Sequence, residues 1–105
     1  MRRVKRFVDE HYADPLPLSR VASVAGLERS YFSRYFHKKS GVCYRDWLNW
    51  LRVNRAIDLM NARDLSITEI GFAVGFRDLR TFERAVDRCT GQCPMALKKK
   101  VQLYS

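Results

Sequence analysis

Apolar residues recur along this chain at spacings of three and four positions, which is the period of a helix with one buried face. The first run consists of Val4, Phe7, Val8 and Tyr12, and the two prolines of "ADPLP" follow it. Because proline interrupts the hydrogen bonds of a helix, this run predicts a first helix that ends near Ala13.

The same spacing predicts three more helices before residue 63. A short second helix begins at Leu18 and stops at Gly26, because glycine can adopt the positive φ of a tight turn. A third helix is expected from about Arg29 to Ser40, where aromatic residues recur at helical spacing. Residues 45–62 contain neither glycine nor proline, so they predict one long connecting helix.

The second part of the chain carries residues typical of helix starts. Ser66 and Glu69 have the spacing of a capping box, which predicts a fifth helix over 66–74. Asp78 and Pro94 suit the first positions of two further helices. These are expected over 79–90 and 94–100. The expected fold class is therefore all-α, with about seven helices in a single domain over residues 1–105.

Composition and charge narrow the function classes. The 105 residues are 47% hydrophobic and contain no long apolar run, which is typical of one soluble domain and not of a membrane protein. Twenty Lys and Arg against eleven Asp and Glu give a formal charge of +9. This excess favours nucleic acid as a partner, with an anionic membrane surface as second choice. The basic clusters lie in separate segments, which favours nucleic acid over a merely solvated surface.

The N-terminus and the cysteines indicate a compartment. The chain opens with "MRRVKRFVDEHY", which lacks the apolar core of a secretory signal. Its three cysteines are an odd number without a CxxC pair, so a disulfide framework is not expected. Both features predict a cytoplasmic protein.

An internal repeat is the most specific feature of the sequence. Its first part pairs positions at an offset of 49: Leu18 with Ile67, Val21 with Ile70, Ala22 with Gly71, and Gly26 with Gly75. Its second part pairs positions at an offset of 50: Phe32 with Phe82, Arg34 with Arg84, Phe36 with Val86, Gly41 with Gly91, and Cys43 with Cys93. One extra residue in the second turn, around Arg77, explains the difference. Each copy predicts a helix-turn-helix, whose second helix can enter the major groove of DNA.

A helical projection divides the second helix of each copy into two faces. In the first copy, the residues expected on or beside the buried face are Phe32, Tyr35, Phe36 and Lys39, and the outward side is expected to carry Ser30, Arg34, His37 and Lys38. Core packing is also expected for Tyr31, because it belongs to the same aromatic stripe. In the second copy, the core side is expected to carry Phe82, Ala85, Val86 and Cys89, and the outward side Arg80, Arg84, Asp87 and Arg88, with Thr81 on the flank. Both outward faces are basic, and arginine can bind the O6 and N7 acceptors of guanine together.

The segments that carry these features resemble a known family. They are "LSRVASVAGLERSYFSRYFHKKSG", "LRVNRAIDLM" and "SITEIGFAVGFRDLRTFERAVDRCTGQCP", and they resemble the two-helix-turn-helix DNA-binding domain of AraC/XylS-type bacterial transcription regulators. The resemblance covers about Val4 to Leu97. It implies a homeodomain-like module with helix-turn-helix subdomains over 1–42 and 63–105 and a linker helix over 43–62. Its two recognition helices would lie in successive major-groove segments about 34–36 Å apart, so that a monomer reads a non-palindromic site.

The resemblance also implies which residues touch DNA. Base contacts are expected at Ser30, Ser33, Arg34, Leu79, Arg80, Thr81, Glu83 and Arg84. Phosphate contacts are expected at Leu18, Arg29, Lys38, Ile67, Arg77 and Arg88, where Leu18 and Ile67 mark helix N-termini. The helical projection independently selects Ser30, Arg34, Arg80 and Arg84. Glu83 would be repelled by phosphate unless it accepts a hydrogen bond from cytosine N4 or pairs with Arg80 or Arg84.

No catalytic residue, metal site or cofactor is expected, and the chain is not expected to be an enzyme. Cys89 and Cys93 have no third ligand nearby, so a buried thiol and a loop thiol are expected there. Neither His11 nor His37 has a nucleophile at an interpretable spacing. The alternative function is a basic helical module that binds an acidic protein.

The partners expected from the resemblance extend beyond this chain. Double-stranded DNA is the first partner, and RNA polymerase is a second candidate. Members of the family commonly join this domain to a sensor or dimerisation domain, which would lie outside these residues. No membrane partner is expected, and the domain itself is expected to be monomeric.

Overall fold

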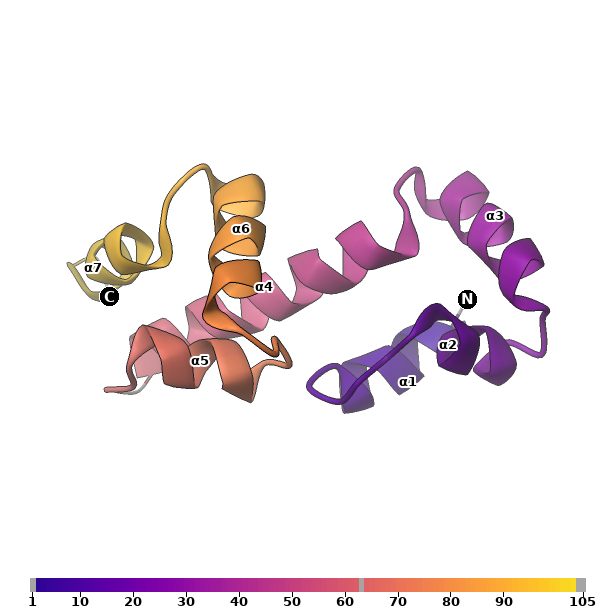
Figure 1. The fold of residues 1–105 in the computed structure, drawn as a ribbon, viewed down its shortest axis with the longest axis horizontal. Helices are drawn as coiled ribbons and strands as arrows, with labels where there is room; N and C mark the ends of the chain where they lie inside the picture. Colours follow the sequence, from indigo (N-terminus) through magenta and orange to yellow (C-terminus); the bar gives the residue numbers. More distant parts are fainter. Residues whose placement is uncertain (1, 63, 104–105) are drawn as a thin grey trace. The chain divides into compact units, whose positions relative to one another are not determined.

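The computed structural model describes residues 2–62 and 64–103, and these residues are mostly helical (Figure 1). They form seven α-helices: α1 (Arg2–His11), α2 (Leu18–Val24), α3 (Arg29–Ser40), α4 (Tyr44–Ala62), α5 (Ile67–Ala73), α6 (Leu79–Thr90) and α7 (Pro94–Leu103). None of the described residues forms a strand, so the all-α prediction is confirmed. The bounds of α3 and α6 are those expected from the sequence.

The ends of the other five helices differ slightly from expectation. The helix α2 ends at Val24, two residues before Gly26, and α4 begins at Tyr44, one residue earlier than expected. The first helix ends at His11, and the N–H of Asp14 donates to the His11 carbonyl (2.9 Å) in a turn. Asp14 precedes Pro15, and the proline ring disfavours a helical backbone at the residue before it. The fifth helix begins one residue late because Ser66 is its N-cap, and the last helix continues to Leu103.

The chain divides into two compact units, and the boundary lies inside α4, between Leu48 and Asn49. The expected linker helix therefore contributes residues to both units. The core of the first unit consists of Val4, Val8, Leu16, Val21, Ala22, Phe32, Phe36, Tyr44 and Leu48. The core of the second consists of Val53, Ala56, Met60, Ile70, Val74, Phe76, Phe82, Ala85, Val86 and Leu97. Among the described residues, Tyr44 in the first core is the only buried side chain that carries a polar group.

An aromatic cluster of Phe32, Phe36, Tyr44 and Trp47 forms much of the first core. The ring of Phe36 lies 5.9 Å from that of Tyr44 and 5.3 Å from that of Trp47, both in tilted or edge-on geometry. The Tyr44 hydroxyl also donates to the carbonyl of Leu16 (2.9 Å), a contact that is buried. Tyr44 thus ties the start of α4 both to α3 and to the loop before α2.

In the second unit, α5 and α6 approach each other closely at Gly71. A Cβ placed on Gly71 would lie only 2.8 Å from Cδ2 and 3.0 Å from Cγ of Phe82. The mid-helix glycine is therefore required by packing, as its unfavourable helix propensity suggested. A hydrogen bond also connects α7 to the loop before α5, because the Lys98 ammonium donates to the carbonyl of Leu65.

The two copies of the repeat share their turn hydrogen bonds. The N–H of Leu27 donates to the carbonyl of Ala22, and the N–H of Phe76 donates to that of Gly71, each at 3.0 Å and at an offset of 49. The N-caps of the following helices, Glu28 and Asp78, are already at an offset of 50. The extra residue in the second turn is therefore Arg77, as expected.

Candidate nucleic-acid interface

The helix α3 has a fixed start and a fixed end. The Glu28 carboxylate accepts a hydrogen bond from the backbone N–H of Tyr31 (2.9 Å), which satisfies a donor left open at the helix N-terminus. This hydrogen bond is the main cause that lowers the pKa of Glu28, and the charge of Arg34 adds a smaller contribution. At the other end, Gly41 is left-handed with a φ of 81°.

The helix α6 is held by the same devices. Asp78 accepts a hydrogen bond from the N–H of Thr81 (2.7 Å), and this bond is the main cause that lowers the pKa of Asp78. The charges of Arg84 and Arg80 lower it further. Gly91 ends the helix with a φ of 74°. Both candidate recognition helices therefore have an N-cap carboxylate at one end and a left-handed glycine at the other, which fix where each helix begins and ends.

The C-terminal turns of α3 and α6 share the same side-chain hydrogen bonds. The hydroxyl of Ser40 donates to the carbonyl of Phe36, and that of Thr90 donates to the carbonyl of Val86, both at 2.7 Å. Each hydroxyl also accepts from the N–H two residues later. The repeat thus extends to side-chain hydrogen bonds, although the residue that makes them is serine in the first copy and threonine in the second.

The predicted base-contacting residues lie on α3 and α6, and all but one have exposed side chains. The exposed ones are Ser30, Arg34, Leu79, Arg80, Thr81, Glu83 and Arg84, and Ser33 is half-buried. Leu79 is 39% exposed despite being apolar. Within each unit, the structure therefore gathers these residues on the side of the helix that faces away from its core.

The predicted phosphate-contacting residues divide into two groups. The charged side chains are exposed; they are Arg29, Lys38, Arg77 and Arg88. Leu18 and Ile67 are half-buried and are the first residues of α2 and α5. For these two, the group available to a phosphate is the backbone N–H.

Three side chains expected on or beside the buried face are exposed. Tyr31 is 53% exposed, and Lys39 is exposed with its ammonium 5.9 Å from the centre of the Tyr35 ring. Cys89, expected to be a buried thiol, is exposed as well. Lys39 and Cys89 occupy equivalent positions of the repeat, in the last turn of their helices. The core contacts of α3 and α6 end at Phe36 and Val86, so Lys39 and Cys89 in the last turns lie beyond the core. Tyr31 is exposed for another reason: it lies about 100° around the helix from the buried Phe32, beside the buried face.

The starts of α2 and α5 are stabilised differently. The Ser66 hydroxyl accepts from the N–H of Glu69 (3.1 Å), and the Glu69 carboxylate accepts from the N–H of Ser66 (3.0 Å), which confirms the predicted capping box. These bonds from Ser66 lower the pKa of Glu69. The equivalent N-cap of α2 is Pro17, whose side chain makes no cap hydrogen bond.

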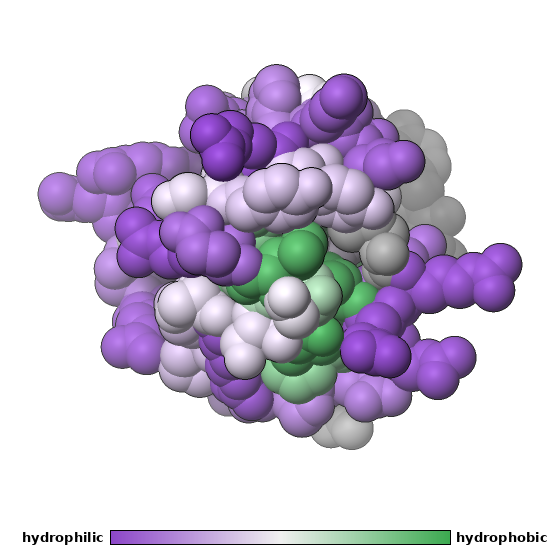
Figure 2. Space-filling view, turned by 90° about the vertical axis from the view of Figure 1, so that its right-hand side faces the viewer, coloured by the Kyte–Doolittle hydropathy of each residue, from purple (hydrophilic) through white to green (hydrophobic). Residues whose placement is uncertain are grey.

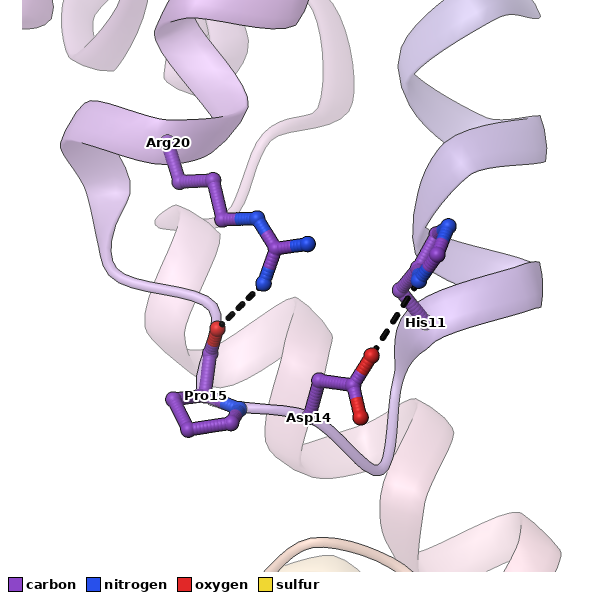
Figure 3. A network of polar contacts seen from close by, with 4 residues as sticks. All are labelled: His11, Asp14, Pro15 and Arg20. Carbon is purple, nitrogen blue, oxygen red and sulfur yellow. Dashed lines mark hydrogen bonds and ion pairs between the residues drawn. The ribbon is translucent and has the colours of Figure 1, made fainter.

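Arg20 fixes the loop before α2 in place of a side-chain cap. Its guanidinium donates to the carbonyl of Pro15 (3.1 Å; Figure 3). The same group lies 5.3 Å from the centre of the Phe7 ring on α1. His11 and Asp14 make a second contact across the same loop, 3.1 Å between Nδ1 and Oδ2. Sequence reasoning did not find these contacts, because a side chain that reaches a loop carbonyl leaves no periodic signal.

The exposed surface of the helices is mostly hydrophilic. Hydrophilic side chains cover most of the face shown in Figure 2 and surround a hydrophobic area near its centre. Among the described residues, no group of three or more His, Cys, Asp or Glu side chains is arranged to hold a metal ion. In the same part of the chain, none of the helices is both long and apolar enough to cross a membrane.

Comparisons with known proteins agree with this geometry. A family model described as a helix-turn-helix domain matches residues 21–100. The regulatory protein PocR of Salmonella typhimurium is 31% identical over 101 residues, covering 96% of this chain and 33% of PocR. The chain spans about a third of the length of PocR and of the Msm operon regulatory protein of Streptococcus mutans, two curated relatives that it matches.

Solved structures show the same fold. The DNA-binding domain of the transcriptional factor AdpA, solved in complex with a target DNA, has a TM-score of 0.91 and 25% identity, covering 98% of this chain and 93% of that one. An AraC-type regulator from Chromobacterium violaceum has a TM-score of 0.85 at 23% identity, over 95% of this chain and 89% of its own. With its two capped helix-turn-helix units, the chain belongs to the helix-turn-helix family of AraC-type DNA-binding domains.

Proposed function

We propose that this domain binds double-stranded DNA sequence-specifically, as the DNA-binding part of a transcription regulator, with α3 and α6 in successive major-groove segments. The observation that carries the proposal is the matched pair of recognition helices. Both are capped by a carboxylate, end at a left-handed glycine, and expose an arginine at the same repeat position, Arg34 and Arg84. An interaction module has no reason to repeat a groove-sized helix in this way.

The proposed roles follow from the chemistry of each side chain. Arg34, Arg80 and Arg84 bind acceptors on base edges, while the hydroxyls of Ser30, Ser33 and Thr81 reach bases or phosphates. Leu79 contacts the methyl group of thymine, and Glu83 accepts from cytosine N4. Phosphates are bound by the side chains of Arg29, Lys38, Arg77 and Arg88 and by the backbone at Leu18 and Ile67.

The rest of the proposal concerns the protein to which the domain belongs. Because the relatives are about three times as long as this chain, a sensor or dimerisation domain accompanies it. The domain itself acts as a monomer in the cytoplasm, has no enzymatic step, and contacts RNA polymerase when it regulates transcription. The excess of basic residues supports the DNA part of this proposal.

A selection of random duplexes on the purified domain tests the proposal. Two short enriched sequence blocks, about one helical turn apart, are the expected result. The enriched duplex should remain bound in excess heparin, because base contacts persist when phosphate contacts are competed. Enrichment of no sequence, with binding that disappears at moderate salt, would contradict sequence-specific reading and favour a basic module for an acidic protein.

A further inference from the structure

The two recognition helices differ in charge although their backbones match. The helix α3 carries four cations and no acid: Arg29, Arg34, Lys38 and Lys39. The helix α6 carries three cations and two acids: Arg80, Arg84, Arg88, Glu83 and Asp87. All of these side chains are exposed, so the difference in charge lies at the surface.

The repeat locates this difference on one flank of the helix. Glu83 and Asp87 are four residues apart and therefore lie one turn apart on the same side. Their counterparts in α3, at an offset of 50, are Ser33 and His37. Arg34 and Arg84 occupy equivalent positions beside these flanks, so the central arginine is common to both helices. One flank of α6 is thus acidic where the same flank of α3 has no acid.

The side chains of Glu83 and Asp87 are both exposed to solvent. Within the described residues, no ion pair joins Glu83 to Arg80 or Arg84. The negative charge of Asp78 lies at the N-terminus of the same helix, and it interacts with Arg84 and Arg80. The acidic flank is therefore available to repel a phosphate strand that comes close to it.

We propose that Glu83 and Asp87 are specificity determinants, which make α6 the selective reader while α3 provides most of the sequence-independent affinity. The inference rests on the proposed function and deepens it. A helix without acids gains affinity from the phosphates of any sequence. The helix α6 loses part of that affinity through its acidic flank, so it binds well only where Arg80 and Arg84 find base-edge acceptors.

Neutralising the acidic flank tests the proposal. The double variant Glu83→Gln, Asp87→Asn keeps the size of both exposed side chains. We expect binding to a scrambled duplex to tighten by about twofold to fivefold for each carboxylate, the range of a single exposed charge interaction. Binding to the selected duplex should change less, because the amide oxygen of glutamine at position 83 can still accept from cytosine N4. The ratio of the two Kd values should therefore fall. The dependence of scrambled-duplex binding on salt should also become steeper.

A matched control separates the local effect from net charge. The double variant Glu10→Gln, Asp58→Asn removes two exposed acids from α1 and α4 and changes the net charge by the same amount. It should leave the ratio of Kd values close to that of the unmodified chain. Circular dichroism of each variant checks that the helices are retained.

The outcomes separate this inference from the proposed function. A ratio unchanged by Glu83→Gln, Asp87→Asn, or one lowered equally by the control variant, would overturn the inference while the selected duplex still supports sequence-specific binding. If the unmodified domain selects no sequence at all, the proposed function fails, and the inference fails with it.

Discussion

Single residues at equivalent positions of the repeat can be compared within one protein. Arg34 and Arg84 are both exposed near the middle of a capped helix, and Lys38 and Arg88 follow one turn later. An arginine fork matches base-edge acceptors in a fixed geometry, whereas a lysine ammonium acts as a point charge. The two kinds of cation should therefore contribute differently to affinity and to sequence preference.

Replacing Arg34 or Arg84 by alanine should weaken binding to the selected duplex by about 1–3 kcal/mol and relax the preference at a few base pairs. Lys38→Ala should weaken binding to all sequences alike and flatten the log–log salt dependence by about 0.9. Kd values for selected and scrambled duplexes, measured over a range of salt concentrations, check both expectations. Equal losses on the two duplexes for the arginine variants would show that these residues do not read bases.

Gly71 shows how one residue limits the packing of two helices. The variant Gly71→Ala should lower the free energy of unfolding, because a Cβ 2.8 Å from the Phe82 ring forces α5 and α6 apart. Overpacking costs about 1–3 kcal/mol, against about 1 kcal/mol gained in helix propensity. Urea unfolding measures the difference. In the first copy, Ala22→Gly is the matched control and should also destabilise, through lost propensity and packing. A Gly71→Ala variant more stable than the original would contradict this prediction, since it would show that Phe82 can move away from the added Cβ without loss of stability.

At the scale of elements, the caps link stability to pH. The carboxylates of Glu28, Glu69 and Asp78 all have lowered pKa values because backbone N–H groups donate to them. A lowered pKa in the folded state means that the unfolded state takes up protons first as the pH falls. The contribution of the caps is therefore fully present above the usual carboxyl pKa of about 4 and is lost below it.

The variant Asp78→Asn isolates this effect. Asparagine caps a helix about as well as aspartate but does not titrate. The denaturation midpoint of the variant should therefore decline less steeply than that of the original between about pH 5 and pH 2. Urea unfolding followed by circular dichroism over this pH series provides the measurement. Parallel pH profiles for the two proteins would show that Asp78 has the same pKa in the folded and unfolded states.

Local signals made most elements predictable from the sequence. Aromatic spacing, the Asp78 cap and the glycines at 41 and 91 define α3 and α6, and their bounds agree with expectation. Helical projection predicted the exposure of Ser30, Arg34, Arg80 and Arg84, whereas the other candidate base-contacting residues followed from the family resemblance. The errors at Lys39 and Cys89 arose because a projection treats a helix as uniformly packed along its length, whereas the core touches only part of it. Tyr31 belongs to the aromatic stripe but lies beside the buried face, so it stays exposed.

Contacts between distant residues could not be predicted. Tyr44 reaches the carbonyl of Leu16, and Lys98 reaches that of Leu65, each from a helix far along the chain. Which loop carbonyl accepts the hydrogen bond depends on the tertiary structure, so neither hydrophobic periodicity nor capping rules can predict it. The roles of the candidate DNA-contacting residues also remain predictions, since exposure alone does not distinguish base contact from phosphate contact.

At the scale of the whole molecule, two units share one helix, because the boundary between them lies within α4. The polypeptide continues from one core to the next without a glycine or proline in this helix. Two readers on one chain carry sequence information that a single reader would obtain only through dimerisation. The division of labour proposed for α3 and α6 would then be a property of the duplicated domain, which neither copy has alone.

The aromatic cluster has a spectroscopic consequence. The half-buried Trp47 lies 5.3 Å from the Phe36 ring and 6.3 Å from the Tyr44 ring in the first unit. Trp50 belongs to the second unit and is 55% exposed. In a Trp50→Phe background, the remaining indole becomes an intrinsic fluorophore whose emission follows the first core alone. Comparing its emission with the helical signal of the entire chain would reveal whether the two cores melt as one cooperative unit or in sequence.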